Sequence, residues 1–208
     1  MKLDVHQQEE LSTIMYFWRD YGKYIIGGVL IILVLYVSNF TVNLYRAKQA
    51  KAAAVLYEQL QDKVKLHDNN GVKTLVQELE TKYPKTEYTA QAGIVGAKYY
   101  VDTAPDTAIS LLQWNISHAK SKPLVEFSRI DLAKIYIDQK KFDQALALLM
   151  QKHDPIFDGL YYETRGDLYV AKGDLDKAKS AYNEAVQKSP KDGGVSQILQ
   201  FKLEAIGQ

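Results

Sequence analysis

Apolar residues are distributed in two different ways along this chain of 208 residues. Residues 24–45 read YIIGGVLIILVLYVSNFTVNLY and contain no charged side chain. From Arg46 onward, apolar positions recur three or four residues apart, which is the spacing of amphipathic helices, and no strand-like alternation of useful length occurs. The pattern therefore predicts an all-α chain in which one uninterrupted apolar helix precedes a series of shorter amphipathic helices.

The apolar segment has the length of a membrane-spanning helix. It contains 22 residues between Lys23 and Arg46. At about 1.5 Å per residue it crosses a hydrocarbon core of roughly 30 Å. Aromatic side chains, which favour membrane–water interfaces, lie just before the segment and toward its end. They are Tyr16, Phe17, Trp18, Tyr21, Tyr24, Tyr36, Phe40 and Tyr45.

Three other interpretations of this segment are weaker. A buried core helix rarely runs this far without a charge, and a peripheral helix would not be apolar on every face between Ile25 and Val37. A cleaved signal peptide would begin with a short basic region and end in a small-x-small site, and neither is present. A retained signal anchor is predicted, with a tail at 1–23, the span at 24–45 and a domain at 46–208.

Charge bias alone does not orient the span, because basic residues are nearly balanced on its two sides. Long domains translocate largely regardless of charge, which favours a cytoplasmic N-terminal tail and an external C-terminal domain.

The domain after the span contains an internal repeat. Three segments share a frame in which Asp lies seven residues, and Ala nine residues, after a Tyr. The three Ala residues, Ala108, Ala145 and Ala178, are 37 and then 33 residues apart. Helix breaks are expected near Asp68–Gly71, Pro84, Pro105, Pro123, Pro155, Gly173 and Pro190.

This period and pattern resemble the tetratricopeptide repeat, a 34-residue helix–turn–helix. The last unit fits best, and Arg165 departs from its frame because an apolar residue is expected there. Its matching residues are Gly159, Tyr162, Gly166, Tyr169, Ala178, Tyr182, Ala185 and Pro190. A degenerate first helix pair is expected over 47–83 and a capping helix over 195–206. The predicted fold is a single transmembrane helix followed by a tetratricopeptide-like helical repeat solenoid.

The residues of the shared repeat frame are expected to have packing roles rather than chemical ones. Gly96 and Gly166 allow two helices to approach closely, and the small Ala residues do the same on the second helix of each unit. Asp106, Asp143 and Asp176 are expected in the first turn of a second helix, where they meet the positive end of its dipole.

Residues for catalysis or metal binding are not grouped in the sequence. The chain has no Cys, its four His residues are isolated from one another, and no nucleophile elbow, H-E-x-x-H or phosphate-binding loop is present. A net charge of +1 gives no electrostatic case for nucleic-acid binding. We therefore expect a protein that is not an enzyme and that needs no cofactor.

The order of tail, anchor and repeats resembles the bacterial YfgM family, ancillary subunits of the Sec translocon. The resemblance covers nearly the full chain and includes three stretches: FWRDYGKYIIGGV at 17–29, YRAKQAKAAAVLYEQL at 45–60 and RGDLYVAKGDLDKAKSAY at 165–182. It implies an inner-membrane protein whose repeats lie in the periplasm. The implied partners are the Sec channel, the membrane-anchored periplasmic chaperone PpiD and unfolded translocating polypeptides, which it would help to pass to periplasmic chaperones.

Two other classes remain open on the sequence. One is a single-anchor repeat adaptor for another envelope assembly pathway, such as cytochrome maturation. The other is a membrane-tethered enzyme whose catalytic residues converge only in space.

Partner-binding residues can be expected where tetratricopeptide arrays line their inner groove, on the first helix of each unit. The middle unit supplies Phe127, Ile130, Lys134, Ile137 and Asp138; the last supplies Leu160, Glu163, Asp167, Val170 and Ala171; the earlier one adds Tyr100 and Val101. Such a groove suits extended chains or an apolar partner segment. Alternatively, the C-terminal helix folds into it and makes Phe127, Ile130 and Leu160 core.

The span offers a second candidate surface. Tyr36, Asn39 and Asn43 lie at i, i+3 and i+7 and share one helix face. Asn can hydrogen-bond between helices in lipid, so this face could contact a partner helix. Proximity to the outer interface explains the same residues without a partner.

Overall fold

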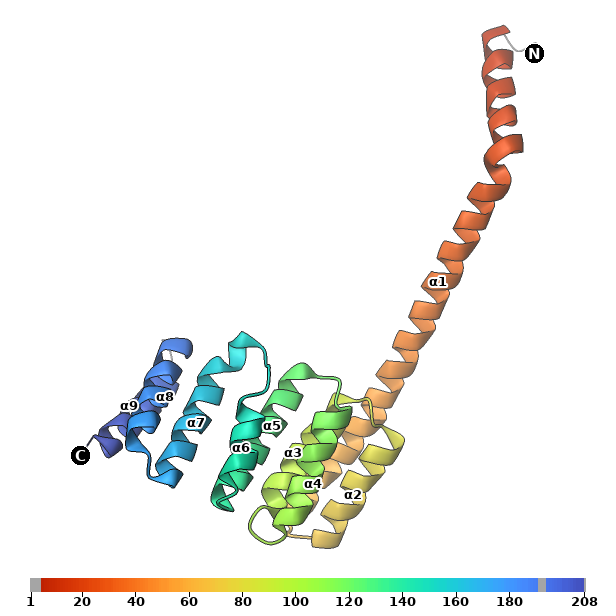
Figure 1. Ribbon diagram of the computed structural model, residues 1–208. Coiled ribbons are helices and arrows are strands. Elements are labelled where there is room, and N and C mark those ends of the chain that lie inside the picture. Colours follow the sequence, from red (N-terminus) through yellow and green to blue (C-terminus); the bar gives the residue numbers. More distant parts are fainter. Residues whose placement is uncertain (1–4, 191–193, 208) are drawn as a thin grey trace. The chain divides into compact units, whose positions relative to one another are not determined.

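The computed structural model describes residues 5–190 and 194–207, and it describes the side chains of 15–190 and 197–207. The described residues form helices and no strands, as the sequence predicted (Figure 1). The elements are α1 (Val5–Lys65), α2 (Asn69–Lys82), α3 (Glu87–Tyr100), α4 (Pro105–His118), α5 (Lys122–Asp138), α6 (Phe142–Leu149), η1 (Pro155–Phe157), α7 (Asp158–Lys172), α8 (Leu175–Lys188) and α9 (Gly194–Ile206). The chain divides after Lys48 into two compact units.

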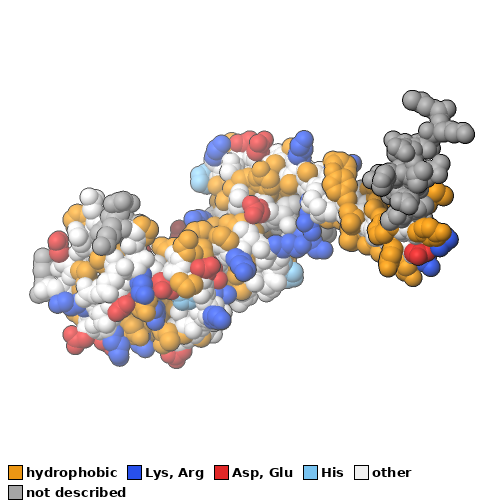
Figure 2. All heavy atoms as spheres, turned by 90° about the horizontal axis from the view of Figure 1, so that it is seen from above, with side chains coloured by type: hydrophobic (Ala, Val, Ile, Leu, Met, Phe, Trp, Pro, Cys, Tyr) orange, Lys and Arg blue, Asp and Glu red, His pale blue; other side chains and the backbone are white. Residues whose placement is uncertain are grey.

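The apolar segment of α1 is exposed along nearly its whole length. From Ile25 to Tyr45 every residue except Gly27 is exposed, although most of these side chains are apolar. Hydrophobic side chains dominate the described surface of this unit, whereas charged side chains interrupt them on the repeat unit (Figure 2). Water penalises such a surface, and lipid does not. By length and composition, α1 is the one described helix suited to cross a membrane.

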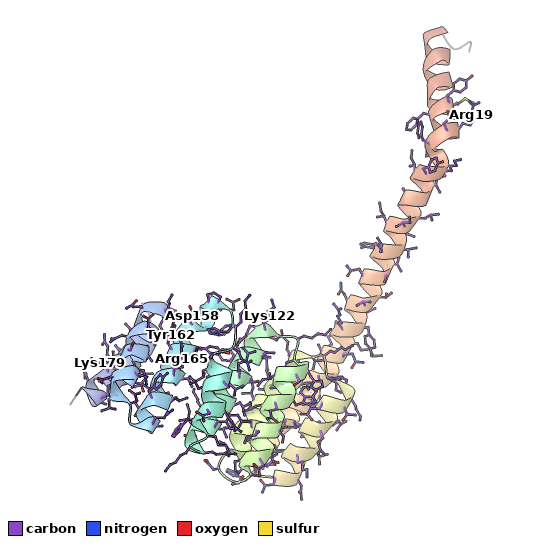
Figure 3. All side chains as sticks on the ribbon, viewed as in Figure 1. Arg19, Lys122, Asp158, Tyr162, Arg165 and Lys179 are labelled. Atoms are coloured by element: carbon purple, nitrogen blue, oxygen red, sulfur yellow. The ribbon has the colours of Figure 1, made fainter. Side chains whose placement is uncertain are left out.

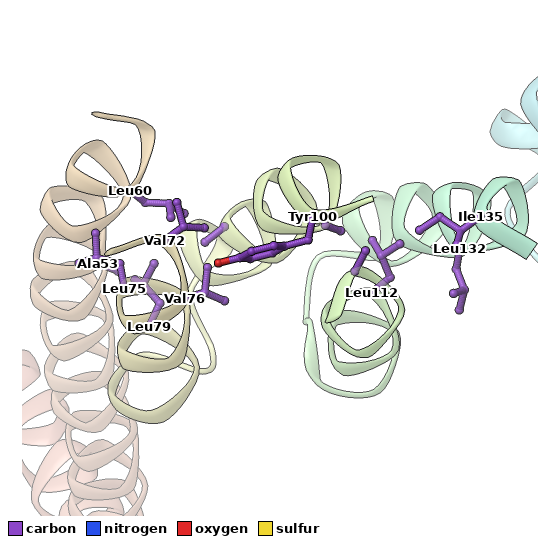
Figure 4. Close-up of a cluster of buried hydrophobic side chains, with 13 residues drawn as sticks. Ala53, Leu60, Val72, Leu75, Val76, Leu79, Tyr100, Leu112, Leu132 and Ile135 are labelled. Carbon is purple, nitrogen blue, oxygen red and sulfur yellow. The ribbon is translucent and has the colours of Figure 1, made fainter. Parts of the chain in front are cut away.

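The first helix pair of the repeat unit consists of the C-terminal part of α1 and α2. Ala53 and Leu60, two turns apart on α1, are buried in one cluster with Val72 and Leu79 of α2 (Figure 4). The degenerate pair expected over 47–83 is therefore present. Its first helix is the C-terminal part of α1, which ends at Lys65.

Each helix break predicted from Gly, Pro or Asp occurs where it was expected. At the first break, Asp68 caps α2 by accepting a hydrogen bond from Gly71 N at 2.9 Å, and Lys63 Nζ donates to the same carboxylate at 2.8 Å. These two bonds hold the pKa of Asp68 below its ordinary value. The first turns of α4, α6 and α8 contain Asp106, Asp143 and Asp176, which confirms their predicted position.

One break has no signal in the sequence. Between α5 and α6 the chain turns at Gln139–Lys141 without Gly or Pro, and Lys140 adopts a φ of 58°. Lys140 N donates to Ile137 O and Lys141 N to Tyr136 O. The same two bonds recur 33 residues later, where Gly173 has a φ of 78°. The repeat geometry therefore holds Lys140 in a backbone conformation that normally favours Gly.

Close approach between paired helices depends on the predicted small residues. A Cβ on Gly96 would lie 3.0 Å from Leu111 Cδ1, and a Cβ on Gly166 would overlap the Tyr182 ring. Ala108, Ala145 and Ala178 have no solvent exposure. Side chains any larger would separate these helices, because protein interiors are already close-packed.

The described repeat helices stack as antiparallel neighbours, and α9 closes the C-terminal end of the stack (Figure 1). Leu199 of α9 is fully buried in a cluster with Ala178, Tyr182 and Ala185 of α8. Helix α9 is thus the capping helix that the sequence predicted. By covering the last pair it removes an apolar face that a terminal repeat would otherwise leave in water.

Candidate partner-binding surfaces

The first helices of successive pairs, α3, α5 and α7, present two adjoining hollows. The larger, of about 450 Å³, lies between α5 and α7. It is lined by Lys134, Ile137, Asp138, Asp167, Val170, Ala171 and Tyr182. Apart from Tyr182, all of these were proposed from the repeat frame, and the structure brings them together. Exposed charges at Lys134 and Asp138 face an apolar floor that includes Val170, which is 38% exposed.

The smaller hollow, of about 140 Å³, lies between α3 and α5 and shares Lys134 and Asp138 with the larger one. Its lining includes Val101, another residue proposed from the repeat frame, and Asp131, which the sequence did not single out. Burial raises the pKa of Asp131, and the nearby positive charges of Lys98 and Lys134 only partly oppose that shift. The two hollows together make one continuous surface along three first helices.

Helix α9 engages part of the predicted groove. Lys202 Nζ donates to Glu163 Oε1 at 2.8 Å and to Asp167 Oδ1 at 2.7 Å, and the Tyr182 hydroxyl donates to the same Asp167 oxygen at 2.7 Å. Burial lowers the pKa of Lys202, but its bonds to the two carboxylates outweigh burial, so that the pKa is raised. Glu163 therefore forms an ion pair with Lys202 inside the protein. This corrects the expectation that Glu163 is free to bind a partner.

The structure also corrects the expectation for the apolar groove residues. Ile130 is 3% exposed and belongs to the core cluster with Ala133 and Tyr161, so it offers no usable surface. Ile137 is 8% exposed and contributes only an edge to the larger hollow. Leu160 is half-buried against the same core.

Phe127 behaves differently from Ile130, although the two residues are three positions apart on α5. It is 41% exposed and packs edge-on against the ring of Phe157, with ring centroids 5.7 Å apart. It is not among the residues that line the two hollows. Phe127 is thus a surface aromatic residue at the N-terminal part of α5.

Tyr100 lies on a different surface from the other predicted residues. Its ring is buried, and its hydroxyl donates to Asn69 O at 2.8 Å. Instead of lining the α3–α5–α7 surface it borders a hollow between α2 and α4. The repeat frame misplaced Tyr100 because adjacent residues of a helix point about 100° apart, and its neighbour Val101 takes the predicted side.

Sequence reasoning missed a buried polar network between α5 and α7. Arg129 Nη1 donates to Glu126 Oε2 at 2.7 Å and to the Tyr161 hydroxyl oxygen at 3.1 Å, and that hydroxyl donates to the same Glu126 oxygen. Burial raises the pKa of Tyr161, and the bond to Glu126 raises it further. Polar residues at i and i+3 within an apolar stripe were the available signal, but their partner is 35 residues away from Glu126.

Arg165, the departure from the repeat frame, is accommodated by stacking. Its guanidinium lies 3.9 Å from the centroid of the Tyr162 ring on the same helix, α7 (Figure 3). Its long apolar stem and its cation–π contact take the place of the expected apolar side chain.

The three polar residues of the membrane segment share an exposed face of α1. Asn43 Nδ2 donates to Asn39 Oδ1 at 3.4 Å, one turn away. Tyr36 is exposed on the same side of the helix. Since a single long bond leaves most donors and acceptors of the two amides unused, this face retains hydrogen-bonding capacity for a neighbouring helix.

Comparison with known proteins identifies the family. Residues 16–208 match the family model of the tetratricopeptide repeat-like domain. An ancillary SecYEG translocon subunit from Neisseria gonorrhoeae is 30% identical over 99% of this chain and 100% of its own length. The chain belongs to the family of ancillary SecYEG translocon subunits. Similar proteins with the same description occur in Escherichia coli, 22% identical over 98% of both chains, and in Haemophilus influenzae, 22% identical over 90% of this chain and 92% of that relative.

Membership confirms the resemblance seen in the sequence. The match to the Neisseria relative covers the apolar helix and the repeats of this chain together. Among the described residues of this member, no group of three His, Asp or Glu side chains is placed to hold a metal ion.

Proposed function

We propose that this protein is an ancillary subunit of the SecYEG translocon in the bacterial inner membrane, and that it acts as a binding scaffold rather than an enzyme. Residues 24–45 anchor it, residues 1–23 lie in the cytoplasm, and residues 46–208 form the periplasmic repeat domain. The observation that carries this proposal is the full-length match of this chain to a translocon subunit. The exposed apolar helix that precedes the repeats in this chain supports the anchor. Protease added to spheroplasts should digest the repeat domain. Protection of that domain would show that the orientation is opposite to the one proposed.

The membrane segment is the proposed contact with the channel or with a companion anchored chaperone of the PpiD type. Asn39 and Asn43 lie on one face and retain hydrogen-bonding capacity. Polar contacts between helices in lipid contribute roughly 0.6 to 2 kcal/mol, which corresponds to a factor of about 3 to 30 in binding.

The test is affinity capture of the full-length protein from gently solubilised membranes, followed by quantification of the channel. The unmodified chain should retain the channel, and the double variant Asn39→Leu, Asn43→Leu should retain about 3- to 30-fold less. Ser38→Leu, Thr41→Leu is the matched control, because those residues lie on another face of the same helix. Absence of the channel from every sample would contradict the translocon role. Equal capture by both double variants would contradict only the Asn face.

The surface along α3, α5 and α7 is the proposed binding site for translocated, still unfolded polypeptides on their way to periplasmic chaperones. It combines an apolar floor with charges of both signs at Lys134 and Asp138. Extended chains present apolar side chains together with backbone polar groups, and such a mixed surface accommodates both.

Binding of a permanently unfolded protein, such as reduced and carboxymethylated lactalbumin, tests this surface in the full-length protein held in lipid nanodiscs. Val170→Asp should weaken binding at least fivefold, because it puts a charge on the apolar floor. The control is Leu175→Asp, since Leu175 is 48% exposed on α8 but lines neither hollow. Equal binding by the two variants would contradict the binding role of this surface. It would not contradict the proposed translocon role.

A further inference from the structure

A third hollow, of about 400 Å³, lies between α2 and α4, which are the second helices of neighbouring pairs. It is lined by Lys73, Val76, Gln77, Glu80, Tyr100, Asp106, Thr107, Ser110, Leu111 and Trp114. We call it the α2/α4 groove. Its apolar floor forms because Gly96 of α3, which has no side chain, allows Val76 and Leu111 to close over it. Tyr100 completes the floor with its hydroxyl bonded to Asn69 O.

The charged groups of the α2/α4 groove are arranged along its length. On α2, Lys73 lies near the start of the helix and Glu80 lies two turns later; on α4, Asp106 lies in the first turn and Trp114 two turns later. Each helix therefore has a charged residue near its start. The carboxylate of Glu80 and the indole of Trp114 line the groove near the ends of the two helices. The indole also stacks against His118, with ring centroids 4.7 Å apart and planes 16° apart.

Glu80 is unusual among the acidic residues of the described chain. Its Oε1 atom is buried, yet it accepts no hydrogen bond from the protein. Burial raises its pKa, and the charge of His118 only partly opposes this. A buried carboxylate oxygen without a partner is costly, so a cation brought to Glu80 would recover a strong interaction.

We propose that the α2/α4 groove binds a partner protein through an arginine flanked by apolar residues, with the guanidinium stacked on Trp114 and paired with Glu80. A guanidinium suits both contacts, because it is planar enough to lie on an indole face and forms directed hydrogen bonds to a carboxylate. The methylene stem of the arginine and its apolar neighbours cover Val76 and Leu111. Binding at this groove is independent of the α3–α5–α7 surface and of the proposed translocon role.

Trp114 makes a direct test possible. The chain contains two tryptophans, and Trp18→Phe leaves Trp114 as the single reporter of indole fluorescence. The full-length Trp18→Phe protein in lipid nanodiscs is titrated with an eight-residue acetylated and amidated peptide of leucine and alanine with one central arginine. The matched peptide carries citrulline, which keeps the shape of arginine and lacks its charge. Because a charged and a neutral peptide partition differently into lipid, the nanodiscs contain only zwitterionic lipid and the free peptide concentration is measured at each point, so that the remaining difference reports the charge.

The arginine peptide should change Trp114 emission saturably and bind at least fivefold more tightly than the citrulline peptide. Glu80→Gln should remove that preference, whereas Glu78→Gln should keep it, because Glu78 pairs with Lys82 and does not line the groove. Equal binding of the two peptides to the otherwise unmodified protein would overturn the proposal without any variant at Glu80. A preference that survives in a folded Glu80→Gln protein would overturn it as well.

Discussion

Replacing Ile130 with serine should strongly destabilise the repeat domain, although the repeat frame places Ile130 in a binding groove. The side chain is almost fully buried with Ala133, Ala145 and Tyr161. Truncating a buried Ile costs about 2 to 5 kcal/mol, and the new hydroxyl would also need a hydrogen-bond partner in an apolar site. We therefore expect a loss of about 4 kcal/mol in the free energy of unfolding, which is a large share of the stability of an ordinary domain.

Phe127→Ser is the control for this prediction. It makes a similar polar change three residues away, at a side chain that is 41% exposed and has Phe157 as its aromatic contact. Its cost should be about 1 kcal/mol. Denaturant unfolding of both full-length variants, followed by circular dichroism, distinguishes the two. Similar stability of Ile130→Ser and Phe127→Ser would show that Ile130 is not a core residue.

Gly166→Ala should destabilise the last repeat by about 2 kcal/mol, even though alanine is the better helix former. The new methyl group would overlap the ring of Tyr182, and overpacking of this kind typically costs about 1 to 3 kcal/mol. Displacing the ring would also strain the bond from its hydroxyl to Asp167, to which Lys202 of α9 is tied. The melting temperature of the domain should fall by about 4 to 8 °C.

Two comparisons isolate the contact with Tyr182. Gly27→Ala in the membrane segment should leave the melting temperature of the domain unchanged, because beyond the adjacent residues and the backbone of its own helix the added Cβ would meet nothing within 4 Å. In a Tyr182→Leu background, Gly166→Ala should lose most of its penalty, since the ring that it strikes is gone. If Gly166→Ala costs the same in both backgrounds, helix approach at Gly166 is not limited by Tyr182.

Much of the fold was predictable because its signals are local. A run of residues without charge marks the membrane helix, and Asp, Gly and Pro mark most of the breaks between helices. The predicted close contacts at Gly96 and Gly166 are present, because only small residues at those repeat positions let paired helices approach. The turn at Lys140 was not predicted, because it contains no Gly or Pro that would mark it in the sequence. Its conformation is imposed by the repeat geometry and not by a residue that prefers it.

The positions of the proposed partner-binding residues were predictable only in part. The repeat frame correctly placed Lys134, Asp138 and Val170 side by side on α5 and α7, because residues at equivalent positions of stacked helices become neighbours. It did not show which of the proposed residues remain exposed. Exposure depends on what packs above a position, and that part of the chain can be far away in sequence.

The sequence by itself determined that this protein has one anchor-like helix and a set of paired helices, since helix length, apolar spacing and breaks are properties of short segments. Only the tertiary structure decided that Ile130 is core, that Tyr100 borders the α2/α4 groove and that Lys202 reaches back 39 residues to occupy Glu163. The physical reason is that burial and ion pairing are set by neighbours in space. A repeat frame specifies positions on one helix, but not the side chains that meet them.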